Sequence, residues 1–526
     1  MTWYTNAVFY ELYVRAFADS NGDGHGDLAG LRRKLDYLQW LGVDCVWLLP
    51  INPSPLKDDG YDVASYYGIH PTYGLMEDFK LTIDEIHRRG MRVMMDFVVN
   101  HTSDQHPWFQ EARRSKDSPL RDYYVWSPTD QKYQGVPIIF PGFETSNWEY
   151  DATTGEYYWH RFYKEQPDLN YDNPAVQQEM VNAAKFWLSM GLDGFRVDAV
   201  PYLVEREGTL CENLPETHEW IKSLRAMAKE VNPEAVLLAE ACLQPDELIP
   251  YFGDNDEFQM CFHFPLMPRL YLALATSDRT SVVDVLDNTP ELSAENQWGT
   301  FLRNHDELNL WLVSENERNF LWDHYAPLPE QRIFTGIRRR LAPLMNNDRR
   351  KIELMHSMLF TLPGSPVLYY GDEIGMTDNV ALSDRNGVRT AMQWNDEANG
   401  GFSSASSEEL YAPVNPDYKT VNVAALKADP ESMLYRVREM IHARKELPVL
   451  GTGALTWFRE LPVQVMGFTR EKDGVKLTAL HNLSENSVQV TLPEVAGWTD
   501  LFTKTTVQET GSIELPPYGY VWLNAN

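Results

Sequence analysis

The residues best suited to chemistry are carboxylates set singly into strongly apolar runs. GFRVDAV contains Arg196 and Asp198, and AVLLAEA has a single charge, Glu240. Each run has the length and β-branched content of a strand buried on both faces, where an unpaired charge is costly. A third segment, FLRNHD, ends in His305 and Asp306. One such acid could simply cap a helix or pair within the core, but two in order, followed by FLRNHD, favour chemistry.

Two carboxyl groups at neighbouring strand ends suit the cleavage of a glycosidic bond with retention. One ionised carboxylate attacks the anomeric carbon, and a second carboxyl group, about 5 to 5.5 Å away, protonates the leaving oxygen. We expect Asp198 to be the nucleophile, kept ionised by Arg196 on the same face of its strand. Glu240, among apolar neighbours, should have a raised pKa and serve as acid and then as base. His305 and Asp306 could hold sugar hydroxyls as the ring distorts.

These residues need a scaffold that gathers strand ends, and the hydrophobic pattern predicts one. Eight apolar runs suited to parallel strands alternate with amphipathic stretches: 7–17, 45–50, 92–99, 194–200, 235–241, 259–264, 300–304 and 366–373. Helical periodicity is clearest over 28–41, 176–190 and 352–362. The order predicts an α/β fold, a (β/α)8 TIM barrel, with its active site at the carboxyl ends of the strands. The functional acids all fall toward those ends: Asp96, Asp198, Glu240 and Asp306.

Two insertions and one change of pattern divide the chain. We expect the catalytic barrel to use residues 1–100 and 171–448. Residues 101–170, dense in Trp, Tyr, Phe, Pro and Asp, are too long for an ordinary connection and predict an inserted subdomain B over the site. A second insertion, at about 308–350, contains IRRRLAP, which we interpret as a solvated helix face rather than a ligand patch. Short alternating runs over 449–526 predict a C-terminal antiparallel β domain, a β-sandwich.

Composition limits the partners. The 526 residues include 46 Lys and Arg against 76 Asp and Glu, and the net charge of −30 disfavours nucleic acid and anionic membranes. A small neutral substrate fits better, and 16 Trp and 27 Tyr offer flat rings that suit sugar faces. No apolar run reaches the roughly 18 residues needed to cross a bilayer, and no signal-peptide pattern is present. The four cysteines lack CxxC spacing, so free thiols and a cytoplasmic location are expected.

The motifs resemble a known family. DFVVNH, GFRVDAV, AVLLAEA and FLRNHD occur in the order and at the barrel spacing of the α-amylase superfamily, glycoside hydrolase family 13. The resemblance implies that Asp198 is the nucleophile, Glu240 the acid/base and Asp306 the transition-state stabiliser. It also implies a pocket for the non-reducing glucose lined by Asp58, Tyr61, His101, Arg196, His305 and Arg389. The Tyr61 ring has a physical reason of its own, since it can stack on a pyranose.

Within this family, several stretches resemble the trehalose synthase group, which interconverts maltose and trehalose. They include CENLPETHE, GIRRRLAPLMNNDRRKIEL and LYYGDEIGM. The resemblance implies intramolecular glucosyl transfer through a β-glucosyl-enzyme, with side hydrolysis, on a small α-glucoside such as maltose or trehalose. The chain could also form a homo-oligomer.

Three departures from that group fall where an acceptor sugar would bind. Pro137 stands for a usual arginine, Cys242 for an asparagine and Trp311 for a glutamate. We expect Cys242 and Trp311 to contact the acceptor, and their changed chemistry should weaken the hold on a released glucose. An α-glucosidase, or a transglucosylase with a different acceptor, is therefore the alternative function. A sugar-binding protein with a vestigial site is a third alternative, disfavoured because all three carboxylates are present.

Two structural Ca²⁺ sites are predicted, and no organic cofactor is expected. The loop DSNGDGHGD offers oxygen ligands at alternating positions, although a simple Asn-Gly and Asp-Gly turn is the plainer alternative: Asp19, Asn21, Asp23 and Asp27. The second set is implied by the trehalose synthase resemblance. It consists of the side chains of Asn100, Asp168 and Glu205 with the backbone oxygens of Tyr202 and Leu203. Both ions would be structural, because double displacement by carboxylates needs no metal.

Overall fold

The computed structural model describes residues 2–508 and 510–525, and its centre is a closed barrel of parallel strands. The barrel strands are β1 (Phe9–Leu12), β2 (Cys45–Leu48), β3 (Arg92–Val98), β7 (Gly194–Asp198), β8 (Val236–Ala239), β9 (Met260–Phe262), β10 (Gln297–Phe301) and β13 (Ser365–Tyr369). Each pairs with its sequence neighbour, and β13 closes the barrel on β1. The predicted (β/α)8 fold is confirmed. Nearly every strand residue is buried, which is why the strands form continuous apolar runs.

One strand lies earlier than its predicted run. The apolar run at 300–304 predicts the seventh strand, whereas β10 ends at Phe301, so that FLRNHD continues into the loop beyond the strand. Gln297 and Gly299 interrupt the apolar pattern and conceal the true start. Gly299 lies in a tightly packed position, because a Cβ there would lie 3.2 Å from the Phe262 ring and 3.4 Å from Leu238. The first run also divides, since its second half forms the short helix α1 (Val14–Phe17).

Helices surround the barrel: α2 (Leu28–Leu41), α3 (Met76–Arg88), α5 (Pro174–Ser189), α6 (Pro215–Val231), α8 (Leu266–Thr276), α9 (Thr280–Asp287), α12 (Arg349–Thr361) and α14 (Met433–Glu446). Helix α2 has the predicted bounds because Asp27 caps its start and Gly42, at a φ of 102°, ends it. Helices α5 and α12 begin before their predicted runs, because Asn173 and Asp348 supply caps outside the apolar period. In the part of the chain that the structure covers, no helix combines the length and apolarity that a membrane span requires.

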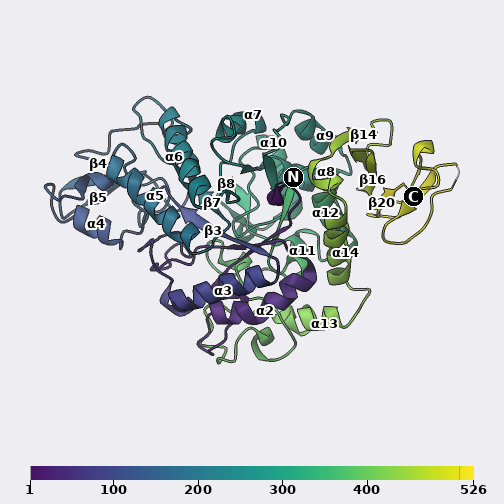
Figure 1. Ribbon diagram of the computed structural model, residues 1–526, viewed down its shortest axis with the longest axis horizontal. Coiled ribbons are helices and arrows are strands. Elements are labelled where there is room, and N and C mark those ends of the chain that lie inside the picture. Colours follow the sequence, from purple (N-terminus) through teal and green to yellow (C-terminus); the bar gives the residue numbers. More distant parts are fainter. Residues whose placement is uncertain (1, 509, 526) are drawn as a thin grey trace.

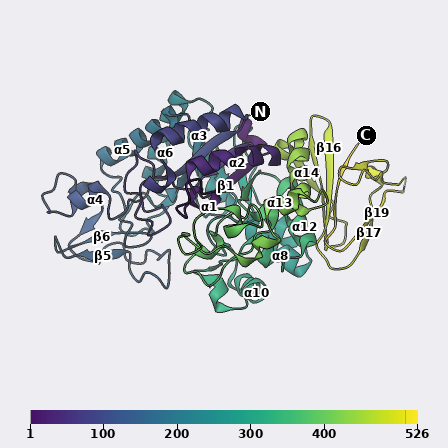
Figure 2. The same ribbon diagram turned by 90° about the horizontal axis from the view of Figure 1, so that it is seen from below.

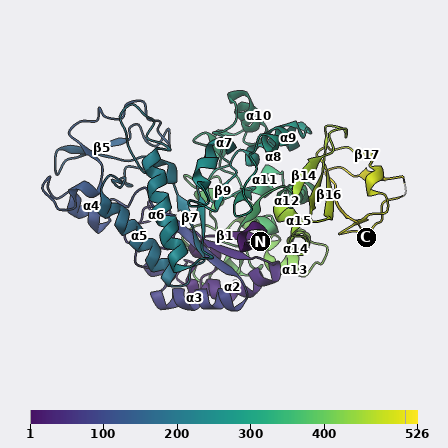
Figure 3. The same cartoon turned by 45° about the horizontal axis from the view of Figure 1, so that its top comes forward.

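Two further units lie on opposite sides of the molecule, with the barrel between them (Figures 1, 2 and 3). The insertion after β3 contains α4 (Pro107–Ala112) and a three-stranded antiparallel sheet of β4 (Trp126–Ser127), β6 (Glu156–Trp159) and β5 (Trp148–Asp151). At the other end, a five-stranded sheet contains β14 (Ala454–Trp457), β15 (Val465–Lys472), β16 (Val475–Asn482), β20 (Tyr520–Asn524) and β18 (Thr499–Asp500). It shares an apolar core with the two-stranded sheet of β17 (Val488–Thr491) and β19 (Ser512–Leu515). The predicted C-terminal antiparallel domain is therefore confirmed.

The second insertion differs from its prediction. It contains α10 (Glu315–Tyr325), the hairpin β11 (Arg332–Ile333) and β12 (Gly336–Ile337), and α11 (Leu341–Leu344). The interpretation of IRRRLAP as a solvated helix face is wrong, because its arginines precede α11 and bind other segments. Arg340 is fully buried and donates to the carbonyl of Tyr370 at 2.7 Å. Arg339 pairs with Asp378 at 3.0 Å, and Arg338 donates to carbonyls within 380–384.

Candidate active site

A buried arginine joins three carboxylates at the centre of the site. Arg196 lies on β7 opposite Asp96 of β3 in the strand register. One guanidinium nitrogen contacts both Asp96, at 2.6 Å, and Asp198, and the other contacts Glu240 at 2.6 Å. Asp198 is the last residue of β7, and Glu240 directly follows β8, where its Oε2 accepts the Ala199 N–H at 2.9 Å. The register of neighbouring strands thus brings the two predicted catalytic carboxyl groups to one cation.

Burial shifts the pKa values of these acids upward, and Arg196 opposes the shift. Desolvation raises the pKa of Asp198 to about 6 despite the attraction of Arg196. Desolvation also raises the pKa of Glu240 to about 7; Arg196 counteracts it, and the charges of Asp198 and Asp306 add to it. Because the pKa of Asp198 is lower than that of Glu240, Asp198 can be ionised while Glu240 still carries a proton.

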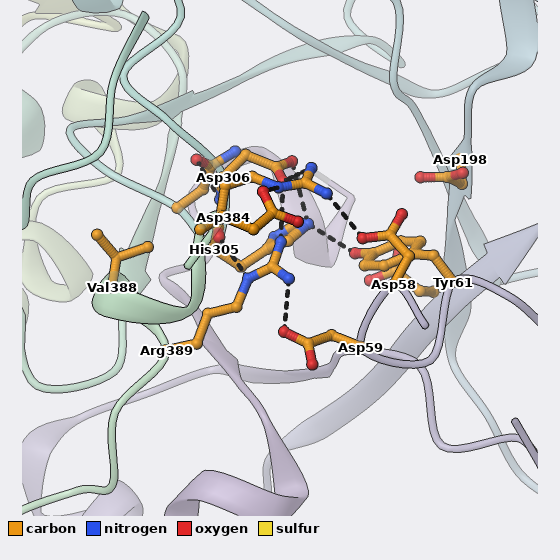
Figure 4. Close-up of polar contacts among 12 residues, drawn as sticks. Asp58, Asp59, Tyr61, Asp198, His305, Asp306, Asp384, Val388 and Arg389 are labelled. Carbon is orange, nitrogen blue, oxygen red and sulfur yellow. Dashed lines mark hydrogen bonds and ion pairs between the residues drawn. The ribbon is translucent and has the colours of Figure 1, made fainter. Parts of the chain in front are cut away.

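A second cluster surrounds Asp306 (Figure 4). His305 donates through Nδ1 to Glu11 at 2.6 Å, and its Nε2 lies 3.1 Å from Asp306 and 2.7 Å from the Tyr61 hydroxyl. Burial by itself would lower the pKa of His305, but Asp306 and Glu11 raise it to about 9. Burial would likewise raise the pKa of Asp306, yet His305 and two arginines hold it well below its usual range. Asp306 is therefore an anion held among cations.

Those two arginines are Arg385, which the sequence analysis missed, and Arg389. Arg385 donates to Asp58 and to Asp306 at 2.7 Å each and lines the pocket. Arg389 points toward Asp59 (Figure 4), pairs with it at 2.6 Å and reaches Asp306 at 3.2 Å from behind the lining. One 3₁₀ turn separates the two arginines. The available signal in the sequence was a second arginine four residues before Arg389, in the segment DRNGVR.

A pocket at the carboxyl end of the barrel gathers most of the predicted residues. Its lining includes Asp58, Tyr61, His101, Asp198, Tyr202, Glu240, Cys242, His305 and Asp306. Further lining residues were not singled out from sequence: Ile139, Phe140, Phe162, Phe264, Met267, Phe301, Asn304, Glu307, Asn309 and Arg385. Arg196 lies behind this lining and holds its acids in place. Burial lowers the pKa of His101 to about 3, so its ring is neutral and accepts from Gln166 at 3.2 Å.

The three departures at the predicted acceptor side occupy different places. Cys242 lines the pocket, where burial, together with Glu240 and Glu307, raises its thiol pKa and keeps it protonated. Trp311 does not line this pocket; its side chain is 48% exposed, two residues beyond the lining residue Asn309. Pro137 is partly exposed and does not line the pocket; it lies two residues before the lining residue Ile139. All four cysteines are free thiols.

In the first predicted Ca²⁺ site, the loop over residues 19–27, the side-chain oxygens accept hydrogen bonds from the loop and from the start of α2. Asp19 accepts the N–H groups of residues 21, 22 and 24, and Asp27 accepts those of Ser20 and Gly30. Asn21 and Asp23 are bonded to each other and to the loop backbone. Among the described residues, no cluster of three or more His, Cys, Asp or Glu could hold a metal ion. The geometry gives this set no support, and it stays a prediction.

The second set has buried oxygens without partners. Asn100 Oδ1, Asp168 Oδ2 and Glu205 Oε1 accept no hydrogen bond. Desolvation raises the pKa of Asp168 to about 8, and desolvation together with the charge of Asp168 raises that of Glu205 well above its usual range. Buried acids with unsatisfied oxygens are stabilised by a cation. These residues, with the nearby backbone of Tyr202 and Leu203, therefore fit a Ca²⁺ ion.

Comparison with known proteins places the chain in a family. The model for the catalytic domain of alpha amylase matches residues 11–323 and 337–453, and that for the C-terminal domain of maltogenic amylase matches 459–522. Trehalose synthase/amylase of Mycobacterium tuberculosis is 48% identical over 99% of this chain and 88% of its own length. Trehalose synthase of Pimelobacter sp. is 50% identical over 90% of this chain and 85% of its own. The solved trehalulose synthase of Pseudomonas mesoacidophila matches with a TM-score of 0.81 at 28% identity, covering all of both chains. The chain belongs to the α-amylase family, glycoside hydrolase family 13.

Proposed function

We propose that this enzyme interconverts maltose and trehalose by moving a glucosyl unit within its pocket. The observation that carries the proposal is the arrangement around Arg196, which holds Asp198 and Glu240 together at adjacent strand ends. The relatives named trehalose synthase support the choice of substrate. A cytoplasmic location and a homo-oligomeric state stay predictions.

The reaction proceeds in two balanced steps. The Asp198 carboxylate attacks the anomeric carbon of the non-reducing glucose while Glu240 gives its proton to the departing glycosidic oxygen. A β-glucosyl ester on Asp198 and one free glucose result. Glu240, now a carboxylate, then takes a proton from an acceptor hydroxyl whose oxygen attacks the same carbon and releases Asp198. If the acceptor is the anomeric hydroxyl of the released glucose the product is trehalose, and if it is water the product is glucose.

The residues across the pocket stabilise and position the donor ring. Asp306 stays ionised among its cationic neighbours and faces the positive charge that develops in the oxocarbenium-like transition state. Asp58 and Arg385, paired at 2.7 Å, present hydrogen-bonding groups to the hydroxyls of the glucose. The Tyr61 ring offers a face for the pyranose, and the neutral His101, whose Nε2 accepts from Gln166, keeps its other ring nitrogen as an N–H donor.

We also propose that one Ca²⁺ ion is held by Asn100, Asp168 and Glu205 with backbone oxygens of Tyr202 and Leu203. The ion would neutralise two buried acids and tie the 101–170 insertion to the segment after β7. Its contribution is structural, and the carboxylate chemistry does not pass through it.

The alternative is an α-glucosidase or a transglucosylase with another acceptor. Cys242 is the observation that favours it, because a protonated thiol in the pocket is a weaker hydrogen-bonding group for a sugar than an amide. A weaker hold on the released glucose would favour water or another acceptor.

Proton NMR of the enzyme incubated with maltose tests the proposal. Trehalose should accumulate faster than glucose, and glucose without trehalose would establish the alternative. Asp198→Asn should abolish both products, whereas Glu230→Gln, at an exposed position at the end of α6, should leave the rates unchanged. Substantial turnover by pure Asp198→Asn would refute the assignment of the nucleophile.

A further inference from the structure

Phe334 has a backbone conformation that bulky residues rarely adopt. It lies between β11 and β12 with a φ of 50°, in the left-handed region that favours Gly, Asn or Asp. Such a conformation is strained and persists only where surrounding contacts compensate for it. Residues 324–336 also lie outside both family matches. The strained conformation of Phe334 must therefore be explained by contacts within this chain.

The compensating contacts come from the other insertion. The rings of Phe334 and Phe140 are stacked, with centroids 4.5 Å apart and planes 20° apart. The Phe143 ring centroid lies 5.5 Å from that of Phe334, with the two planes 59° apart. Phe140 is 7% exposed and forms part of the pocket wall. The two insertions, far apart in sequence, thus meet through aromatic rings at the wall of the active site.

Arg385 joins this aromatic contact to the carboxylates. Its guanidinium carbon lies 5.1 Å from the Phe140 centroid and 5.7 Å from that of Phe334, within the range of cation–π attraction. The same guanidinium donates to Asp58 and to Asp306. The position of the two rings and the position of the donor-side arginine therefore depend on each other.

The base of the hairpin is held tightly. Leu308 and Ile337 exchange two backbone hydrogen bonds, at 2.7 and 3.1 Å. A Cβ at Gly336 would lie 2.4 Å from the Glu307 side chain, so the hairpin packs directly on the loop that follows Asp306. A tip fixed in this way can keep the Phe334 ring over Phe140.

We propose that Phe334 is a positioning residue which, through Phe140 and Arg385, keeps the released glucose in the pocket and so sets the ratio of isomerisation to hydrolysis. The inference rests on the proposed function, in which a free glucose must remain beside the glucosyl-enzyme until it attacks. Without the ring, Phe140 loses its stacking partner and the pocket wall loosens. The neutral hexose then escapes more often, and water takes its place.

The test uses Phe334→Asn, because asparagine tolerates the left-handed conformation and removes the ring. Phe334→Tyr keeps the ring, and Phe320→Ala removes a 40% exposed ring from α10 of the same insertion as a control. Initial rates from maltose by NMR should show the glucose-to-trehalose ratio rising by about threefold to tenfold in Phe334→Asn, the range expected for one aromatic pair. The other two variants should match the wild type. An unchanged ratio in Phe334→Asn, or an equal rise in Phe334→Tyr, would overturn the inference.

A second measurement separates this inference from the proposed function. If the wild type forms no trehalose, the proposed function fails, but retention of the sugar can still be measured. In an Asp198→Asn background, the dissociation rate of maltose, followed by stopped-flow tryptophan fluorescence, should rise by about threefold to tenfold when Phe334→Asn is added. A dissociation rate equal to that of Asp198→Asn alone would overturn the role of Phe334, whichever reaction the enzyme performs.

Discussion

Replacing Arg196 by glutamine should move the whole pH profile of the enzyme to more alkaline values. Arg196 pairs with Asp198 and Glu240, and its charge opposes the rise in pKa that burial causes in both. Activity requires ionised Asp198, so activity is lost as the pH falls through that pKa. A higher pKa for Asp198 therefore moves the acid limb to higher pH, and the same change at Glu240 moves the basic limb in the same direction.

The expected size follows from the pKa of Asp198, about 6 with Arg196 in place. An adjacent opposite charge lowers a carboxyl pKa by about 1–3 units, so removing it should place the pKa near about 8. The ionised fraction of Asp198 at pH 7 then falls from about nine-tenths to just under one-tenth, a loss of about tenfold from the protonation of Asp198 alone. The buried Asp96 and Asp198 and the partly exposed Glu240 would also lose their cation, which should cost about 3–5 kcal/mol of unfolding free energy.

The assay is kcat/KM for an aryl α-glucoside across the pH range, because this quantity reports the pKa values of the free enzyme. Measurements should be made well below the unfolding temperature of the variant, with circular dichroism as a check of folding. Arg88→Gln, which removes an exposed partner of Glu85, is the matched control and should leave the profile unchanged. An Arg196→Gln enzyme whose acid limb coincides with that of the wild type would refute the electrostatic role assigned to Arg196.

Three further predictions follow from other parts of the structure. Glu240→Gln should lower maltose turnover by about 10²–10⁴, yet largely spare fluoride release from α-glucosyl fluoride, whose leaving group needs no proton; equal losses would contradict its role as acid. Because the pKa of Asp168 is raised to about 8, the metal-free protein should lose stability as the pH rises from about 4 toward that value. Added Ca²⁺ should then raise the unfolding temperature more at pH 8.5 than at pH 6, and an effect that persists in Asp168→Asn would count against the site. Arg470→Met should lower the unfolding free energy, measured in urea, by about 2–4 kcal/mol, because the buried carbonyls of Thr361 and Gly453 lose their donor. A loss under about 0.5 kcal/mol would show that these hydrogen bonds do not stabilise the fold.

The barrel and its acids could be predicted because parallel strands buried on both faces must be apolar throughout. Against that background Asp198 and Glu240 were conspicuous, and the structure brings them to one arginine. The same pattern places β10 too late, because its run is broken by Gln297, which donates to the carbonyls of Thr5 and Gly451, and by the tightly packed Gly299. It also misinterpreted IRRRLAP, because a charged segment gives no local sign that buried carbonyls and acids elsewhere will bind it.

The sequence by itself determined the fold class, the strand ends that carry carboxylates and the position of both insertions, since each depends on local periodicity and composition. The tertiary structure alone decided that Arg385 lines the pocket while Arg389 lies behind it, and that Trp311 lies outside this pocket. It alone placed Phe334 on Phe140. These contacts join segments far apart in the chain, and their geometry comes from how the insertions pack over the barrel, for which no short stretch of sequence carries a periodic signal.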